Sequence, residues 1–127
     1  MGGARRPHRV LECPPGREEL GRAAWTVLHT TAAYYPENPS PFAQLAATAL
    51  VGAVAALYPC DDCRTDFAEA VKREPVHMHL SSRANFAAYL CRRHNEVNAK
   101  LGKPAFACDA TALDTRWRSG CKEDEGE

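Results

Sequence analysis

Apolar residues recur at spacings of three and four along most of this chain, which is the pattern of one face of an α-helix. No stretch alternates between apolar and polar residues as a half-buried β-strand does. The 127 residues are enough for one domain and too few for two separate cores. The sequence therefore predicts an all-α domain, a bundle of four helices with a short fifth helix.

Proline, glycine and capping residues set the expected helix ends. The prolines of "PENPSP" end the first helix, Ser40 caps the second, and Ser81 or Ser82 caps the fourth. The expected helices cover residues 17–35, 41–58, 60–74, 83–101 and, with Asp109 as cap, part of 108–117. Their apolar stripes are predicted as Leu20, Ala24, Val27, Leu28 and Thr31; Phe42, Leu45, Ala49, Val54 and Leu57; and Phe86, Leu90, Val97 and Leu101.

Charge and hydropathy exclude two classes of partner. The formal net charge is zero, so the overall charge of the chain does not indicate nucleic-acid binding. No apolar run approaches the ~20 residues that cross a bilayer. Residues 1–12, which contain three arginines, and the acidic residues 122–127 are expected to be tails that flank one domain at 13–121.

The pair Cys60 and Cys63 lies at the expected start of the third helix. A helix N-terminus stabilises a thiolate, and this argument favours Cys60, although the neighbouring aspartates oppose it. Three interpretations stay open on these residues alone: a redox pair, a structural disulfide, or a zinc site. The zinc site would use a Cys₃His set formed by Cys60, Cys63, Cys91 and His94.

Two further clusters are candidates for binding. The fourth helix carries amide and cationic side chains that could hold a nucleotide or phosphate, or could form a solvated face: His94, Asn95, Asn98, Lys100 and Lys103. The first helix carries residues that could form a wall for a planar cofactor, or could be an ordinary amphipathic face: Arg22, Trp25, His29 and Tyr34.

The segments "LGRAAWTVLHTTAAYYP", "YPCDDC", "LCRRHNEVNAKLGKPAFAC" and "RWRSGC", in this order, resemble the Erv/ALR family of FAD-linked sulfhydryl oxidases. The resemblance covers residues 13–121. It implies a four-helix bundle that cradles FAD, closed by the fifth helix, and a homodimer. It also implies that Cys60–Cys63 is the redox-active disulfide, with Cys63 nearest the flavin and Cys60 facing the substrate.

The same resemblance implies the remaining sites. Besides Cys63, the cofactor contacts would be Gly21, Arg22, Trp25, His29, Tyr34, Cys91, His94, Asn95, Val97, Asn98, Lys100, Leu101, Lys103, Arg116 and Trp117. Cys91 and Cys108 would form a structural disulfide. Cys13 and Cys121 would form a bond between subunits, although Cys121 stands where the family pattern leads us to expect an aromatic residue.

The activity implied is oxidation of protein or small dithiols to disulfides, with electrons passing through FAD to oxygen, giving hydrogen peroxide, or to cytochrome c. The implied partner is a thiol-containing protein such as a mitochondrial import oxidoreductase. The implied compartment is the mitochondrial intermembrane space, with the cytosol as the alternative. The competing hypothesis is a non-catalytic helical interaction module held together by zinc or disulfides.

Overall fold

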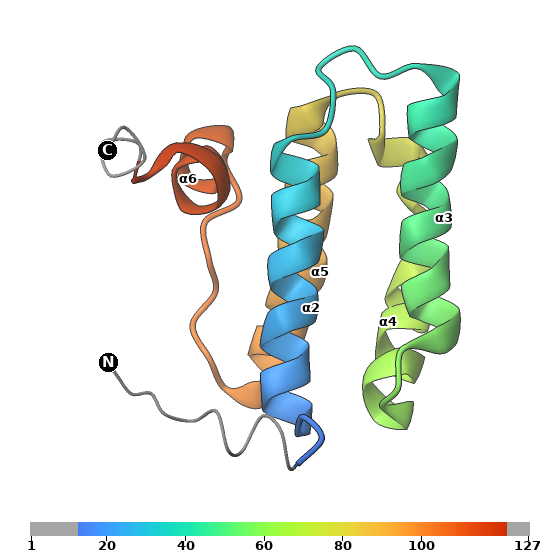
Figure 1. Cartoon of the computed structure of the whole chain (residues 1–127), viewed down its shortest axis with the longest axis vertical. Coiled ribbons are helices and arrows are strands. Elements are labelled where there is room, and N and C mark those ends of the chain that lie inside the picture. Colours follow the sequence, from blue (N-terminus) through green and yellow to red (C-terminus); the bar gives the residue numbers. More distant parts are fainter. Residues whose placement is uncertain (1–12, 122–127) are drawn as a thin grey trace.

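The computed structural model describes residues 13–121, and within that range every regular secondary-structure element is helical (Figure 1). The predicted all-α class is confirmed. The main helices are α2 (Arg17–Ala33), α3 (Pro41–Leu57), α4 (Asp61–Arg73), α5 (Arg83–Leu101) and the short α6 (Ala110–Asp114). None of these helices is long and apolar enough to cross a bilayer.

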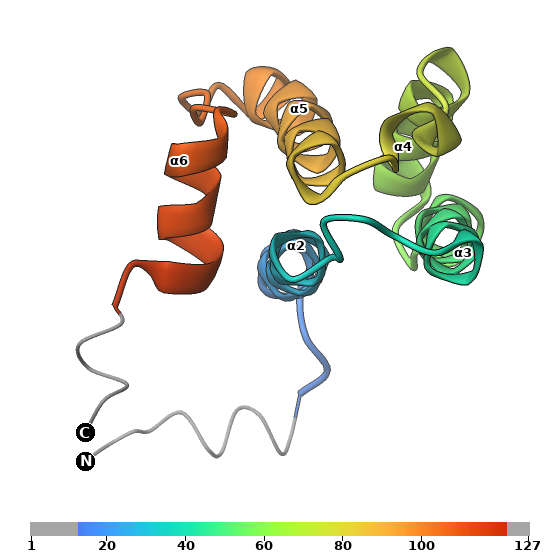
Figure 2. The same cartoon turned by 90° about the horizontal axis from the view of Figure 1, so that it is seen from above.

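The four long helices form the bundle, and α6 lies outside it. Viewed from above, α2, α3, α4 and α5 occupy the four corners of the bundle (Figure 2). The pairs α2–α5 and α3–α4 make the most extensive helix contacts. Helix α6 lies beside α5, to which an extended segment, residues 102–109, connects it (Figure 1).

Side-chain caps explain where the helices begin. The hydroxyl of Ser40 accepts a hydrogen bond from the amide of Ala43 at 3.0 Å, and Pro41 takes the first helical position. Ser82 rather than Ser81 caps α5. Gly102 ends α5 at φ 73°, in the left-handed region that a Cβ disfavours. Asp109 caps α6 as predicted.

Three local features differ from the prediction. Helix α2 ends at Ala33, two residues before the expected end. A 3₁₀ turn, η1 (Val76–His79), precedes α5 and was not predicted. Helix α6 continues into a π-helical turn, η2 (Thr115–Ser119), which was also missed. A Cβ at Gly120 would collide with the carbonyl of Thr115, so this turn requires glycine at its end.

The predicted apolar stripe of the second helix is wrong. Phe42, Leu45 and Leu57 are 79%, 66% and 76% exposed, whereas Ala47 and Val51 are buried. Because α3 is apolar on all sides, its periodicity does not identify one buried face. The stripe positions Val27 and Leu101 are exposed as well.

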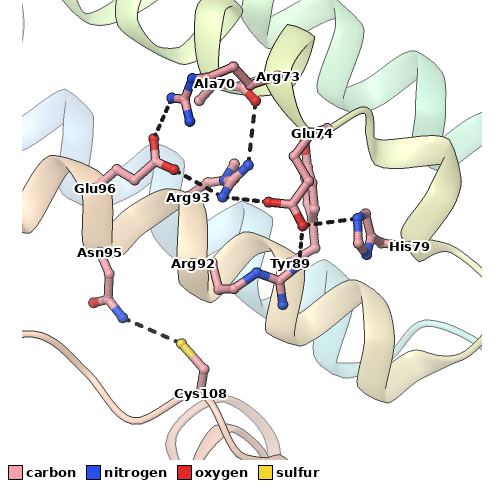
Figure 3. Close-up of polar contacts among 10 residues, drawn as sticks. All are labelled: Ala70, Arg73, Glu74, His79, Tyr89, Arg92, Arg93, Asn95, Glu96 and Cys108. Carbon is pink, nitrogen blue, oxygen red and sulfur yellow. Dashed lines mark hydrogen bonds and ion pairs between the residues drawn. The ribbon is translucent and has the colours of Figure 1, made fainter.

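The core lies between the long helices, and a charged network closes one side of it. Arg93 is only 5% exposed and pairs with Glu74 at 2.7 Å and with Glu96 at 3.0 Å. Glu74 also accepts from Arg92 at 2.7 Å and lies 3.0 Å from His79 (Figure 3). Desolvation opposes ionisation of Glu74, but these cations keep its pKa below the usual value. The network therefore joins the end of α4 and η1 to α5.

Candidate functional site

Cys60 and Cys63 are bonded to each other at the start of α4. Cys60 is the N-cap residue, and its sulfur accepts a hydrogen bond from the amide of Cys63 at 3.4 Å. Both residues are half-buried, so the disulfide is accessible from the surface. The structure therefore places this pair at the start of a helix, as the sequence predicts.

A guanidinium group contacts this disulfide from another helix. Nη2 of Arg17, in the first turn of α2, lies 3.5 Å from Sγ of Cys63. The nearby acids are partly neutralised, because Arg64 pairs with Asp61 and Lys100 pairs with Asp66, each at 2.7 Å. Sequence reasoning missed Arg17, because no local pattern relates it to a cysteine 46 residues away.

Four aromatic rings from three parts of the chain form one cluster. Trp25 stacks on His94 with 4.2 Å between ring centroids and an interplanar angle of 4°. His29 stacks on Trp117 at 4.6 Å. Nε2 of His29 and Nδ1 of His94 share a hydrogen bond of 2.9 Å. The predicted first-helix and fourth-helix clusters thus meet at these rings, and Trp117 of η2 joins them.

Protonation of the two histidines of the cluster is disfavoured. Burial, followed by repulsion from a protonated His94 and from Arg116, lowers the pKa of His29 from 6.5 to about 3. Burial, followed by the charges of Arg116 and Lys103, lowers the pKa of His94. The positive charge beside the rings therefore comes from Arg116 and Lys103 and not from the imidazoles.

Trp117 has an unused hydrogen-bond donor. Its Nε1 is buried and has no partner among the described residues. The guanidinium carbon of Arg116 lies 4.4 Å from the centroid of the Trp117 ring. A buried donor without a partner costs free energy, so a ligand acceptor at this point would be stabilising.

The segment that carries α6 is fastened to α5 at two points. A disulfide joins Cys91 to Cys108, the pair that the family resemblance implies. The side chain of Asn95 accepts from the amide of Phe106 and donates to its carbonyl, each at 2.9 Å, and donates to Cys108 Sγ at 3.4 Å (Figure 3). We name residues 102–109 the strap.

The alternative zinc site is not assembled. Cys91 is bonded to Cys108 and is therefore unavailable as a ligand beside Cys60, Cys63 and His94. Within residues 13–121 no group of three or more His, Cys, Asp or Glu side chains is placed to hold a metal.

A cleft of about 340 Å³ lies on the α6 side of the aromatic cluster. Its walls include His29, Trp117, Arg83, Leu113 and Arg118. Cys60 and Cys63 do not line it, so the cleft is separate from the disulfide.

The remaining predicted contacts are distributed unevenly around this site. Gly21 lies beside Tyr58, with 3.9 Å between a Cβ added to it and the tyrosine hydroxyl. Tyr34 is exposed, with the guanidinium of Arg118 5.8 Å from its ring centroid, and is not part of the aromatic cluster. Lys100 is engaged with Asp66. Among the other predicted cofactor contacts, Val97 and Asn98 are half-buried. Three of these contacts are exposed: Arg22, Leu101 and Lys103.

Cys13 and Cys121 are exposed and unbonded within the chain. A bond between subunits is not tested by one chain, so this pairing stays a prediction. The expected tails, residues 1–12 and 122–127, lie outside the described residues.

Known proteins provide a direct test of the family resemblance. The Erv1/Alr family model matches residues 22–118. The chain is 41% identical over 104 residues to "FAD-linked sulfhydryl oxidase ERV1" of Oryza sativa subsp. japonica, which covers 82% of this chain and 52% of that protein. It is 34% identical over 118 residues to "Mitochondrial FAD-linked sulfhydryl oxidase ERV1" of Saccharomyces cerevisiae, covering 93% and 60%.

A solved structure extends the similarity to the fold. The crystal structure of the FAD-binding domain of Erv1 from Saccharomyces cerevisiae superposes with a TM-score of 0.78 at 33% identity, covering 84% of this chain and 98% of that one. The chain spans 52% to 60% of the length of the two curated relatives described above. In sequence and in fold, the chain belongs to the Erv1/Alr family.

Proposed function

We propose that this protein is an FAD-dependent sulfhydryl oxidase that converts dithiols to disulfides through Cys60–Cys63. The observation that carries the proposal is a half-buried disulfide at a helix start, in the same bundle as a cluster of four aromatic rings. Relatives in the same family are named as FAD-linked sulfhydryl oxidases, which supports this assignment.

The residues around the rings fit FAD chemically. Flat aromatic surfaces suit planar ring systems, the unpartnered Nε1 of Trp117 offers a donor, and Arg116 and Lys103 suit a diphosphate. When bound, FAD supplies an oxidant that takes two electrons from a dithiol and passes them to an acceptor. The proposed contacts are those named from the resemblance, with Trp25, His29, His94, Lys103, Arg116 and Trp117 best supported by their position.

The disulfide performs the exchange with substrate. A substrate thiolate attacks Sγ of Cys60, the bond to Cys63 breaks, and its electron pair stays on Cys63. A second substrate thiolate then attacks the substrate sulfur of the mixed disulfide and releases Cys60. The substrate leaves as a disulfide, having lost two electrons and two protons. The final acceptor in the proposal is oxygen, giving hydrogen peroxide, or cytochrome c.

A homodimer is part of the proposal. The exposed apolar side chains Phe42, Leu45 and Leu57 lie on α3, and Val27 is exposed on α2. Three large exposed apolar side chains on one helix favour an interface between copies of the chain. A bond from Cys13 to Cys121 of a second copy would reinforce that interface.

The compartment and substrate follow from the relatives. Two relatives, from Saccharomyces cerevisiae and Schizosaccharomyces pombe, are named as mitochondrial enzymes, which supports a mitochondrial location. The proposal places the protein in the intermembrane space, with the cytosol as the alternative. Its substrate would be a thiol-containing protein, such as a mitochondrial import oxidoreductase.

One set of measurements tests the activity. The purified protein should carry a flavin spectrum and consume oxygen when dithiothreitol is added. Cys63→Ser should retain FAD and lose turnover, because it cannot form the disulfide. A protein that stays colourless after incubation with FAD and oxidises no dithiol would instead support the non-catalytic module, in which Cys91–Cys108 acts only as a staple.

A further inference from the structure

We propose that Arg17 is a positioning residue that stabilises Cys63 as a thiolate and thereby directs substrate attack to Cys60. The inference deepens the proposed function and rests on it, because it concerns the thiol form that an oxidase cycle produces. Nη2 of Arg17 lies 3.5 Å from Sγ of Cys63, and the two residues come from different helices. Packing of α2 against the rest of the bundle therefore places a full positive charge at one of the two sulfurs.

The Arg17–Cys63 contact stabilises the reduced protein more strongly than the oxidised one. A disulfide sulfur is neutral and a weak acceptor, whereas a thiolate carries a full charge and accepts charge-assisted hydrogen bonds. On reduction, two electrons and two protons leave the substrate dithiol. One proton is taken up by Cys60 as a thiol, the other goes to solvent, and Cys63 remains a thiolate. Arg17 thus favours the reduced pair.

The two sulfurs have different partners. Sγ of Cys60 accepts from the amide of Cys63 at 3.4 Å, at a helix end equivalent to about half a positive charge. Sγ of Cys63 receives the guanidinium of Arg17, which carries a whole charge. The helix-end argument alone favours Cys60 as the thiolate. The guanidinium reverses that preference in favour of Cys63.

Two of the acids on α4 are paired with cations, and the first turn of α2 carries Glu18 and Glu19 beside Arg17. On α4, Asp61 is paired with Arg64. Asp66 of α4 is paired with Lys100 of α5. Asp62 has no ion pair within residues 13–121 and opposes the thiolate. Arg17 is the cation whose nitrogen contacts the Cys63 sulfur, so it is the group whose removal should change the Cys63 pKa.

The consequence for exchange is directional. A thiol of lower pKa leaves faster when its disulfide is attacked. Lowering the pKa of Cys63 makes it the better leaving group, so that attack at Cys60 is faster than attack at Cys63. The sulfur order implied by the family resemblance thereby gains a physical cause in a residue outside the Cys-x-x-Cys motif.

Single-thiol proteins test the inference without relying on turnover. In a background carrying Cys13→Ser and Cys121→Ser, Cys60→Ser leaves Cys63 as the free thiol, and the rate of iodoacetamide alkylation against pH gives its pKa. Arg17→Gln should raise that pKa by about one unit, which lowers the alkylation rate at pH 6 about tenfold. Arg17→Lys should retain most of the rate.

Two controls separate a contact from a general effect of charge. Cys63→Ser in the same background leaves Cys60, whose pKa Arg17→Gln should leave nearly unchanged. Lys72→Gln removes the same charge from the last turn of α4 and should not affect the pKa of Cys63.

The reduction potential of the disulfide gives a second measurement, made on the full chain. A glutathione titration should show that Arg17→Gln lowers this potential by about 30 mV, which is equivalent to a tenfold change in the equilibrium constant.

The results that overturn the inference are specific. An unchanged Cys63 pKa in Arg17→Gln, or equal shifts at Cys60 and Cys63, would exclude a selective contact. Failure of the proposed function is distinguishable: a chain that binds no flavin and oxidises no dithiol, yet shows the Arg17 effect, would remove the oxidase assignment and keep the Arg17–Cys63 coupling.

Discussion

His29 of α2 and His94 of α5 share a hydrogen bond of 2.9 Å, and each ring also stacks on a tryptophan. His29 is only 4% exposed. The pair joins two helices of the bundle. Burial and the nearby cation Arg116 disfavour protonation of both rings, and Lys103 adds to this effect at His94. The cluster is therefore a polar contact that depends on pH.

We predict that the protein loses stability as the pH falls from 6.5 towards 3. The pKa of His29 is lowered to about 3 in the folded chain, so the unfolded chain binds the extra proton in this window. His29 alone should contribute a loss of ~2 kcal/mol between pH 7 and pH 5. The free energies of unfolding obtained from urea denaturation at pH 7 and at pH 5 measure this loss.

His29→Gln is the matched variant for this measurement. Its amide can still bond to His94 but does not titrate, so the variant should lose less stability than the wild type over the same pH range. Equal losses in the two proteins would show that other groups, such as the carboxylates of the Glu74 network, account for the whole pH dependence.

The Cys91–Cys108 disulfide should contribute substantially to stability. It joins residues 17 positions apart, and a loop of that size corresponds to about 3 kcal/mol in the chain-entropy model. Cys108→Ser should therefore lower the free energy of unfolding by roughly that amount in urea denaturation. The double variant Cys60→Ser, Cys63→Ser is the control, because its disulfide spans only 3 positions. Equal losses in both proteins would contradict this account.

Asn95 should hold the strap independently of that disulfide. Asn95→Ala removes both hydrogen bonds to the backbone of Phe106, at an expected cost of about 1–3 kcal/mol. Amide exchange at Phe106 should accelerate in hydrogen–deuterium exchange, because this amide loses its acceptor. Asn38→Ala, at an exposed position between α2 and α3, should leave that amide unchanged. Continued protection of Phe106 in Asn95→Ala would show that the strap is held elsewhere.

Leu45→Lys should separate the proposed homodimer. Leu45 is 66% exposed within one chain, so the substitution should not disturb the bundle core. A charge buried at a subunit interface should raise the dimer dissociation constant at least about tenfold, measured by analytical ultracentrifugation. Met78→Lys changes an equally exposed apolar position in η1 and should leave the dimer dissociation constant unchanged. A Leu45→Lys protein that stays dimeric at all concentrations would exclude this face.

The fold could be predicted largely from local signals. Ser40 with Pro41, Gly102 and Asp109 fix helix ends through caps and backbone geometry, which depend on a few neighbouring residues. The buried face of α3 could not be predicted in this way. Its residues are apolar on every side, so only the position of the other helices decides that Val51 is buried and Leu45 is exposed.

The candidate site shows the same limit. The Trp25 and His94 clusters could be recognised as candidates because each lies within a few helical turns. Their direct stacking depends on the pairing of α2 with α5 and could not be read from either segment. Arg17 is the clearest example. It contacts Cys63 in the folded chain, but 46 residues separate the two in sequence, so no local pattern predicts the contact.

The strap has a consequence for the biogenesis of the site. Leu113 of α6 is buried, but within the described residues no residue of α6 belongs to the main core cluster between the long helices. Trp117 and Arg116 reach the rings from beyond the strap, which Cys91–Cys108 and Asn95 fasten to α5. Fastening that wall covalently therefore requires the thiols of Cys91 and Cys108 to be oxidised. A newly made copy would need, for its own maturation, the same chemistry that it is proposed to perform on others.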